Sequence, residues 1–448
     1  MNFNVEIQKL KDLARQAADV IDEHEYVRVI SHNDADGLTS AAIICRALMK
    51  KGIHFHTTIV PRLDDTVVDT VIESAGEKDL VLFCDMGSGQ SDMISRISQE
   101  IVVLDHHIPV GESPAKVMVN PHLVGIDGAM HLSASGVTYF VAKALDESNT
   151  ELAGLAIAGA VGDKQLMDTV NSTILKEAEE AGVISVHKGL KMGDGDIADV
   201  LEYTPEPYLD ITGNREKIDE FLDILEIKGN IGELSTDELK KLTSAIALKL
   251  AKKASPEAID ASIGDVYHLD RELVNNVYDM VAILNTCGRM DKAGMALSIC
   301  MHDREHLAEA QKMAVEYQRS IVENINKALD KLQIGDNIGY LITQDMESTG
   351  MVASTMVRYI NPEIPFIAVN QVEDIVKVSA RGTRALVSNG LDLAFALREA
   401  SKSVGGDGGG HNIAAGASIP QDTAEEFIAK VDEIVGSQIG NKIEGQAS

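Results

Sequence analysis

Acidic residues and histidines gather in two short clusters of this 448-residue sequence. The first cluster is His32-Asn33-Asp34-Ala35-Asp36-Gly37, and the second is Asp105-His106-His107. Each cluster follows a run of apolar, β-type residues, and so does Asp85 between them. Crowded carboxylates repel one another and resist burial unless a cation neutralises them. The sequence therefore predicts a divalent metal site at the ends of buried strands, where parallel α/β sheets hold their active sites.

The set of possible ligands has six members, which are His32, Asp34, Asp36, Asp85, His106 and Asp163. Mixed carboxylate and imidazole ligands suit Mn²⁺ or a similar borderline metal better than Ca²⁺, and the lack of thiolates argues against structural zinc. Six ligands are too many for one catalytic ion that keeps open positions, whereas two ions bridged by one carboxylate would use them all. Such a pair of ions serves displacement at phosphorus. Any one acid alone is better explained as a helix cap or a turn residue, and only the whole set favours a metal site.

Asp105 and His107 are the candidate catalytic residues of the second cluster. Adjacent residues at a strand end point in different directions, so His106 and His107 need not both bind metal. His107 could contact phosphate or protonate the leaving oxygen, or it could simply hydrogen-bond to a ligand.

Strand-like and helical runs alternate in the N-terminal part. Residues 1–25 have the spacing of an amphipathic helix. Strands are expected at 26–31, 54–60, 80–84 and 101–104, with helices at 37–51, 66–74, 91–98, 134–145 and 152–161. This alternation predicts an α/β fold with a doubly wound parallel sheet.

The pattern of residue types that indicates secondary structure changes twice further along the chain. From about residue 182 to 270 the strand pattern fades, which indicates a mainly helical insertion, and a long amphipathic helix is expected from about residue 306. The last part returns to α/β texture, with strands near 338–342, 365–369 and 375–379 and helices near 349–360 and 391–401. We expect four segments: 1–181 as catalytic domain, 182–270 as insertion, 271–333 as the return to the core with a connecting helix, and 334–448 as a smaller α/β domain.

The C-terminal segment carries candidate phosphate-binding residues. Lys377, Ser379 and Arg381 alternate on one face of an expected strand. The glycine-rich run from Gly405 to His411 could cradle an anion with its backbone N–H groups, which would involve Gly409, Gly410 and His411. Arg289 is a further candidate anchor in the central part. The alternative for the three residues of the expected strand is an ordinary face exposed to solvent. The alternative for the glycine-rich run is a loop that binds no ligand.

Composition narrows the functional classes. A net charge of −30 disfavours non-specific binding to nucleic acid, so an anionic substrate must be attracted by metals and local cations. The four cysteines are scattered in apolar runs, which indicates reduced core thiols rather than a zinc site. With no signal-peptide pattern and no apolar run near the ~20 residues that cross a bilayer, we expect a cytoplasmic protein without membrane contact.

The ordered motifs resemble those of the DHH phosphoesterase superfamily. His32-x-Asp34-x-Asp36-Gly37, Asp85, Asp105-His106-His107 and Gly162-Asp163 look like its four motifs. The stretch from Gly408 to Gly416 looks like the signature of its C-terminal DHHA1 domain. The length, the insertion and the segment 285–290 resemble archaeal RecJ-like single-strand exonucleases, including relatives that associate with the GINS replication complex.

The resemblance implies a division of the ligands between two Mn²⁺ ions, for which Mg²⁺ or Co²⁺ could substitute. His32 and Asp34 would hold the first ion, Asp36, His106 and Asp163 the second, with Asp85 between them. His411 would hold substrate. The implied activity is removal of nucleotides from single-stranded DNA or RNA, in DNA replication and repair or in RNA turnover.

Two alternatives stay open. A small-substrate DHH hydrolase would act on short oligoribonucleotides, a bisphosphorylated nucleotide (pAp) or a cyclic dinucleotide, although such members are usually shorter. A replisome structural subunit that binds GINS is the non-enzymatic alternative, against which the complete ligand set argues. Strand polarity and the choice between DNA and RNA have no motif in this sequence.

Overall fold

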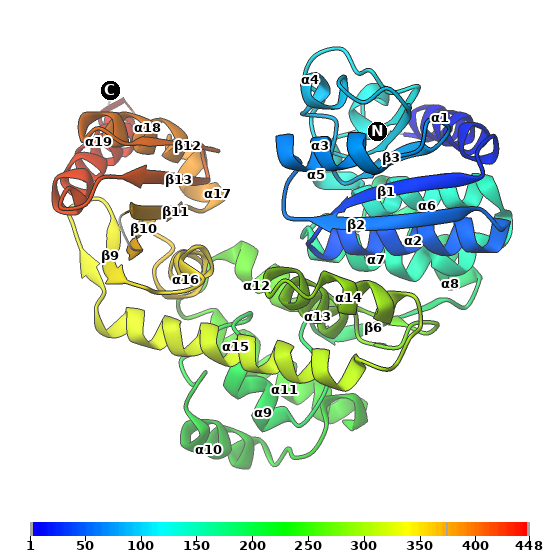
Figure 1. The fold of residues 1–448 in the computed structure, drawn as a ribbon. Helices are drawn as coiled ribbons and strands as arrows, with labels where there is room; N and C mark the ends of the chain where they lie inside the picture. The colour runs from blue at the N-terminus through cyan, green and yellow to red at the C-terminus, as the bar shows by residue number, and fades with distance from the viewer. Residues whose placement is uncertain (1–2, 373–374, 446–448) are drawn as a thin grey trace. The chain divides into compact units, whose positions relative to one another are not determined.

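The computed structural model describes residues 3–372 and 375–445, and the chain divides into two compact units (Figure 1). The first unit comprises residues 1–187 and 266–314, and the second comprises residues 188–265 and 315–448. Most of the segment predicted as an insertion thus belongs to the same unit as the C-terminal segment.

A five-stranded parallel sheet forms the centre of the first unit. Its strand order is β2-β1-β3-β4-β5, with β1 at Tyr26–His32, β2 at His54–Val60, β3 at Leu80–Cys84, β4 at Glu100–Leu104 and β5 at Val117–Val119. Alternate residues of β3 enter different cores: Leu80 and Leu82 lie in one, whereas Val81 and Phe83 lie in the other. Burial on both faces explains why these strands are continuously apolar. The predicted doubly wound parallel sheet is confirmed.

Helices cover both faces of this sheet (Figure 1). One core includes residues of α1 (Asn4–Asp22), α2 (Ala35–Lys51), α6 (Ala134–Leu145) and α7 (Ala153–Gly162). The other includes residues of α3 (Asp65–Ser74) and α4 (Ser91–Ile94). The helix expected at 91–98 is therefore shorter than predicted. The unit also contains 3₁₀ helices at Pro121–Val124 and Glu147–Leu152, α5 (Gly128–His131) and α8 (Thr169–Glu180).

The order of the strands creates a topological switch point. The chain passes from β1 to β2 on one side, and β3 then pairs with β1 on the other side. Open α/β sheets bind ligands at the carboxyl ends of strands where the direction of winding reverses. The carboxyl ends of β1 and β3 are therefore the expected place for a functional site.

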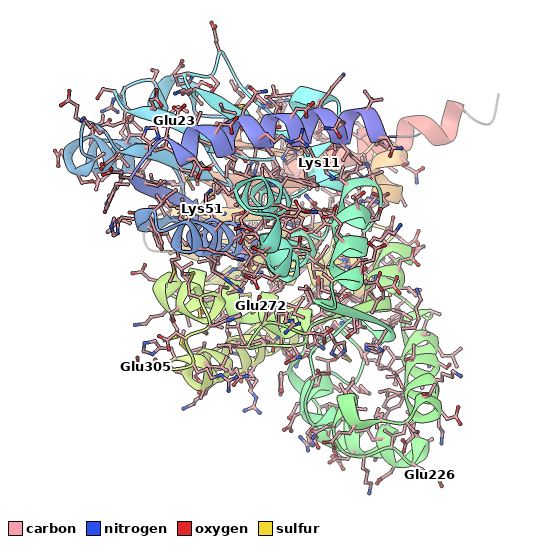
Figure 2. All side chains as sticks on the ribbon, turned by 90° about the vertical axis from the view of Figure 1, so that its right-hand side faces the viewer. Lys11, Glu23, Lys51, Glu226, Glu272 and Glu305 are labelled. Atoms are coloured by element: carbon pink, nitrogen blue, oxygen red, sulfur yellow. The ribbon has the colours of Figure 1, made fainter. Side chains whose placement is uncertain are left out.

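The first unit is completed by a later part of the chain. It includes α13 (Val277–Arg289), α14 (Ala293–Cys300) and the first residues of α15 (Leu307–Asp330). The buried carboxylate of Glu272, labelled in Figure 2, accepts a hydrogen bond of 3.0 Å from Arg46 of α2. A two-stranded sheet of β6 (Ile184–Leu190) and β7 (Ile263–Leu269) contains the points at which the chain leaves this unit and returns to it.

The second unit is built on a six-stranded mixed sheet of order β12-β13-β11-β10-β9-β8. Its strands are β8 (Gln333–Ile334), β9 (Gly339–Gln344), β10 (Phe366–Val372), β11 (Ile375–Arg381), β12 (Asp407–Gly410) and β13 (Ala414–Ile419). Its C-terminal helices are α16 (Thr349–Thr355), a π-helical turn at Met356–Ile360, α17 (Arg384–Ser388), α18 (Leu393–Ser403) and α19 (Ala424–Gly445). The predicted second α/β domain is thereby confirmed.

The helical part of the insertion shares a core with this C-terminal part. Its helices are α9 (Ile197–Tyr203), α10 (Arg215–Leu225), a 3₁₀ turn at Ile231–Glu233, α11 (Thr236–Leu250) and α12 (Pro256–Ser262). Leu242 and Ile246 of α11 lie in the same apolar cluster as Ile325 of α15. None of the helices in the described ranges is both long and apolar enough to cross a membrane.

Candidate metal centre

The first acidic motif occupies the turn from β1 into α2. β1 ends at His32, and Asp34 caps α2 by accepting a 3.0 Å hydrogen bond from the backbone N–H of Gly37. A Cβ atom at Gly37 would overlap the backbone carbonyl of His32, so only glycine allows this tight turn. Asp34 therefore does cap a helix, but this role uses only one of its carboxylate oxygens. The other oxygen lies 2.9 Å from His32 Nδ1 and remains available to a metal ion.

Asp85 lies at the carboxyl end of β3, in the left-handed backbone region with φ of 57°. Non-glycine residues in this region are uncommon, and they persist where surrounding structure enforces them. The side chain is buried, and its Oδ1 has no hydrogen-bond partner among the described residues. A buried, unpaired carboxylate oxygen is costly unless a cation or proton compensates it.

The six predicted ligands come together around Asp85. His32 Nδ1 lies 3.4 Å from Asp85 Oδ2 on one side, and His106 Nε2 lies 3.3 Å from Asp85 Oδ1 on the other. His106 Nε2 is also 3.4 Å from Asp163 Oδ2 and 3.9 Å from Asp36 Oδ2. Three overlapping groups have the compactness of metal sites: His32 with Asp34 and Asp85, Asp36 with His106 and Asp163, and Asp85 with His106 and His107.

The charges of this cluster perturb one another strongly. Burial alone would lower the pKa of His106, but the nearby carboxylates of Asp85 and Asp36 raise it to about 11. His32 behaves alike, because Asp34 and Asp85 outweigh its burial and raise its pKa to about 10. Burial raises the pKa of Asp85 to about 6. Burial and the charge of Asp36 likewise raise the pKa of Asp163. The cluster therefore has an excess of negative charge that cations would stabilise.

Backbone groups fix Asp36 and His106 from behind. The backbone N–H groups of Ala134 and Ser135, at the start of α6, donate to the two carboxylate oxygens of Asp36 at 2.7 and 2.9 Å. This helix end stabilises the carboxylate as an anion. His106 Nδ1 is 2.9 Å from the carbonyl oxygen of Gly128, to which it can donate, and this arrangement leaves Nε2 facing the carboxylates. Metal-binding histidines usually have such a partner.

Asp105 lies behind the cluster and is fully buried. Its Oδ1 accepts from the backbone N–H groups of His106 and His107 and lies 2.8 Å from His107 Nδ1. Its Oδ2 accepts from the backbone N–H of Ser88. Burial would raise the pKa of Asp105, but the hydrogen bond with His107 lowers it to about 2. This geometry gives Asp105 a positioning role, whereas the His107 side chain is 59% exposed.

Several supporting residues carry no motif that sequence reasoning could use. Asn120 donates to Ser88 Oγ and to the carbonyl oxygen of His107, each at 2.9 Å. Gln165 donates to the same Gly128 carbonyl that His106 contacts. Asn120 directly follows β5. The sequence predicted the helix at 134–145, but it did not indicate that the backbone at the start of this helix, or the side chain of Gln165, would contact the candidate ligands.

Arg289 belongs to a segment that packs directly on the first motif. It is the exposed last residue of α13. One turn earlier, Asn285 Oδ1 accepts from the backbone N–H of Ala35, and the Asn33 side chain donates to the carbonyl of Gly288. A Cβ atom at Gly288 would overlap the carbonyl oxygen of Asn33. The structure thus places the predicted anchor next to the ligand-bearing turn.

The predicted cationic face exists on β11 of the second unit. Val376, Val378 and Ala380 are buried, whereas Lys377, Ser379 and Arg381 point to the opposite face. Ser379 Oγ lies 3.3 Å from Thr349 Oγ1 at the start of α16. Burial lowers the pKa of Arg381. Gly416 pairs with Ser379, and Gly409 pairs with Gly416, so two residues without side chains continue the row that begins at Ser379.

The glycine-rich run is a hairpin rather than the expected loop. Its residues 407–410 form β12, which pairs antiparallel with β13, and His411 lies exposed in the turn between them. Within β12, Gly410 is the residue with a positive φ, of 137°. A Cβ atom at Gly409 would meet open space, whereas one at Gly410 would lie 2.8 Å from the carbonyl oxygen of Ala414.

Comparison with protein families assigns both units. Residues 26–160 match the DHH family N-terminal domain, and residues 337–437 match the DHHA1 domain. An uncharacterized protein of Methanocaldococcus jannaschii is 32% identical over 97% of this chain and 98% of its own length. The single-stranded-DNA-specific exonuclease RecJ of Thermus thermophilus is 27% identical over 56% of this chain, and the match covers 41% of that longer protein.

Solved structures share the fold. RecJ from Thermus thermophilus in complex with Mn²⁺ superposes with a TM-score of 0.60 at 19% identity, covering 96% of this chain and 55% of that one. CDC45 from Entamoeba histolytica superposes with a TM-score of 0.63 at 13% identity, covering 97% and 99%. With the two family matches and the near full-length relative, this chain belongs to the DHH/DHHA1 phosphoesterase superfamily as a RecJ-like member.

Proposed function

We propose that this protein is a two-metal phosphodiesterase that removes nucleotides from an end of single-stranded DNA or RNA. The observation that carries the proposal is the position of Asp85 between two groups of ligands, with one buried carboxylate oxygen that lacks a hydrogen-bond partner among the described residues. The likeness to RecJ nucleases supports the substrate class.

The residues present suit a pair of divalent ions. His32 and Asp34 would hold one ion, Asp36, His106 and Asp163 the other, and Asp85, which lies between the two groups, would serve both. Imidazole and carboxylate ligands favour Mn²⁺, with Mg²⁺ or Co²⁺ as possible substitutes. When bound, the ions would supply Lewis acidity towards the phosphoryl oxygens and lower the pKa of water.

His107 is the protein group best suited to proton transfer. The Asp105 carboxylate lies 2.8 Å from its Nδ1 and raises the pKa of the ring, which favours the protonated form. The exposed ring leaves Nε2 open to a bound phosphodiester. His107 would then donate a hydrogen bond or a proton to the departing oxygen.

Substrate capture falls to the second unit and to Arg289. Lys377, Ser379 and Arg381 present two cations and a hydroxyl on one strand face, and His411 with Gly410 lies in the neighbouring hairpin. These groups would hold phosphates of the strand. Arg289, beside the first motif, would add a contact close to the reacting phosphate.

A time course with Mn²⁺ on matched DNA and RNA strands, labelled at each end in turn, tests the proposal. We expect stepwise loss of nucleotides from one end by the wild type, and no product from Asp85→Ala, which should keep the fold. Asp146→Ala, which removes an acid that only caps a 3₁₀ helix, is the matched control and should stay active. An enzyme inert on strands yet fast on a dinucleotide, pAp or a cyclic dinucleotide would replace the nuclease with a small-substrate hydrolase.

Association with GINS or other replisome proteins is a separate proposal that the CDC45-like fold motivates. An active nuclease could also be a replisome component. Pull-down with purified GINS subunits tests this association. A protein that hydrolyses single strands but does not bind GINS would be a nuclease without that partner.

A further inference from the structure

A basic helix stands out on the insertion of this acidic chain. Residues 236–253, which include α11, contain five lysines and only two acids, although the whole chain has a net charge of −30. Ser235 and Glu238 form a capping box that fixes where α11 begins, and therefore which residues share a face. Leu242, Ile246 and Leu250 form the buried face in the core of the second unit.

The lysines lie on the part of this segment that faces solvent. Lys240, Lys241, Lys252 and Lys253 are exposed, as is Ser244 between them. We call these four lysines the lysine stripe. Lys240 and Lys241 lie in α11, whereas Lys252 and Lys253 lie in the turn that follows its end at Leu250. Roughly two and a half turns of helix, about 13 Å along the axis, separate the two pairs. A ligand that contacts the whole stripe must therefore carry several negative charges in a row.

No acid of the described residues forms an ion pair with any member of the lysine stripe. The fifth lysine differs, because Lys249 lies 2.8 Å from Asp210 and 5.1 Å from the ring centroid of Phe221. In a chain with such an excess of acids, four exposed lysines without such a partner leave a local positive potential unneutralised.

We propose that the lysine stripe binds the phosphate backbone of the single-stranded substrate, as a site separate from the metal cluster and from the cationic face of β11. The inference rests on the proposed nuclease function, which needs contacts that hold a long strand. Lysine contacts with phosphates are independent of base sequence, as an exonuclease requires.

The composition of the stripe favours nucleic acid over an acidic protein. Protein interfaces are depleted in lysine and enriched in arginine and aromatic residues, and residues 236–253 contain neither of the latter. Leu248 is 71% exposed within the same face, but a single exposed apolar residue does not make a protein interface. Long, mobile lysine side chains can follow successive phosphates of a flexible strand.

The test compares two quadruple variants of the full-length protein. One carries Lys→Gln at positions 240, 241, 252 and 253. The control carries Lys→Gln at positions 9, 78, 327 and 331, four exposed lysines that form no ion pair within the part of the chain that the structure describes. Because all eight side chains are exposed, both variants should fold, and circular dichroism checks this.

Binding is measured without catalysis, by fluorescence anisotropy of a labelled oligo-dT 20-mer in the presence of a chelator, over a range of salt concentrations. The stripe variant should bind about tenfold more weakly at moderate salt. The slope of log K against the logarithm of the salt concentration should also become shallower, by roughly 0.7 for each phosphate that a lysine no longer neutralises. The control should bind like the wild type. Equal weakening in the two variants would overturn the proposal, since general charge would then explain the binding.

Two further measurements separate the possible outcomes. With Mn²⁺, the stripe variant should hydrolyse a dinucleotide at the wild-type rate but a 20-mer with a raised KM. A wild type that hydrolyses neither substrate would refute the proposed function. The anisotropy measurement would still show whether the lysine stripe binds a single strand. If poly-glutamate displaces the 20-mer from the wild type as readily as unlabelled oligo-dT does, and not from the stripe variant, the stripe prefers an acidic protein and the proposal fails.

Discussion

The metal cluster of the first unit and the cationic face of the second unit are built in opposite ways. In the cluster, Asp36 and His106 each have a second hydrogen bond that fixes the side chain from behind. In the second unit, Lys377 of the cationic face and His411 of the β12–β13 turn are both exposed. Strand alternation sets the position of Lys377, and the hairpin turn sets that of His411. If the proposed function holds, this difference means that the chemistry needs fixed distances, whereas capture of a strand tolerates mobile side chains.

After the complete loss of product expected for Asp85→Ala, the next largest effect comes from a glycine behind the cluster. A Cβ atom at Gly159 of α7 would overlap Asp36 Oδ1 and Ser135 Oγ. Gly159→Ala should therefore displace Asp36 and lower strand hydrolysis by about a hundredfold or more, because a shift of about 1 Å can cost that much. Steady-state kinetics on a labelled single strand measures this decrease.

Gly154→Ala in the same helix is the matched control. A Cβ atom there would have only ordinary contacts, of 3.7 Å or more, with Val183, Glu272 and Leu269. This variant should keep full activity and gain roughly 0.5–1 kcal/mol of stability from the better helix propensity. Equal activity of the two alanine variants would mean that Asp36 needs no fixed position.

His411→Ala should have a smaller effect of a different kind. Removing one charge-assisted hydrogen bond costs about 1.5–3 kcal/mol, which is roughly ten- to a hundredfold in kcat/KM. The effect should appear mainly in KM, while Mn²⁺ affinity stays at the wild-type value. A fall in Mn²⁺ affinity as large as that of Asp36→Ala would move His411 into the metal site and end the division between the two regions.

The hairpin glycines sharpen the same comparison. Gly410 has φ of 137° and no room for a Cβ atom, so Gly410→Ala should lower the free energy of unfolding by about 1–3 kcal/mol and weaken strand binding. Gly409→Ala, next to it, should change neither quantity. Thermal unfolding and anisotropy measure both. A larger loss of stability or strand binding in Gly409→Ala than in Gly410→Ala would contradict this prediction, because Gly409 would then be the position that requires glycine.

The pH dependence of metal binding is the smallest effect that we predict. The pKa values of His32 and His106 are raised to about 10 and about 11, so both rings carry a proton at pH 7 when no metal is bound. Ligation requires neutral imidazoles, and Mn²⁺ binding should therefore release about two protons per chain at pH 7 and tighten as the pH rises. Calorimetry in buffers of different ionisation enthalpy measures the release.

The same shifts predict the stability of the metal-free protein. A histidine with a raised pKa stabilises the fold fully below its ordinary value of 6.5, and this stabilisation disappears as the pH rises through about 10 to 11. In the calorimetric experiment, a release of almost no protons on Mn²⁺ binding at pH 7 would contradict both predictions, because the two rings would then be neutral in the metal-free protein.

The sequence predicted the parallel sheet and the meeting of the six candidate ligands, because apolar runs and strand-end acids depend on local pattern. It placed β1 to β4 within one residue of their observed bounds. It missed the hydrogen bonds of Gln165 and of the α6 backbone, which depend on contacts between distant segments. It also indicated a loop at residues 405–411, because glycine lacks the β-propensity that would have indicated β12.

The stoichiometry of Mn²⁺ binding tests the central claim most directly. Equilibrium dialysis of the wild type, Asp34→Ala and Asp85→Ala, with Asp146→Ala as control, counts the bound ions per chain. We predict two ions for the wild type and the control, one for Asp34→Ala, and none held tightly by Asp85→Ala, because Asp85 would serve both sites. Two tightly bound ions in Asp85→Ala, or a single ion in the wild type, would contradict the two-metal account.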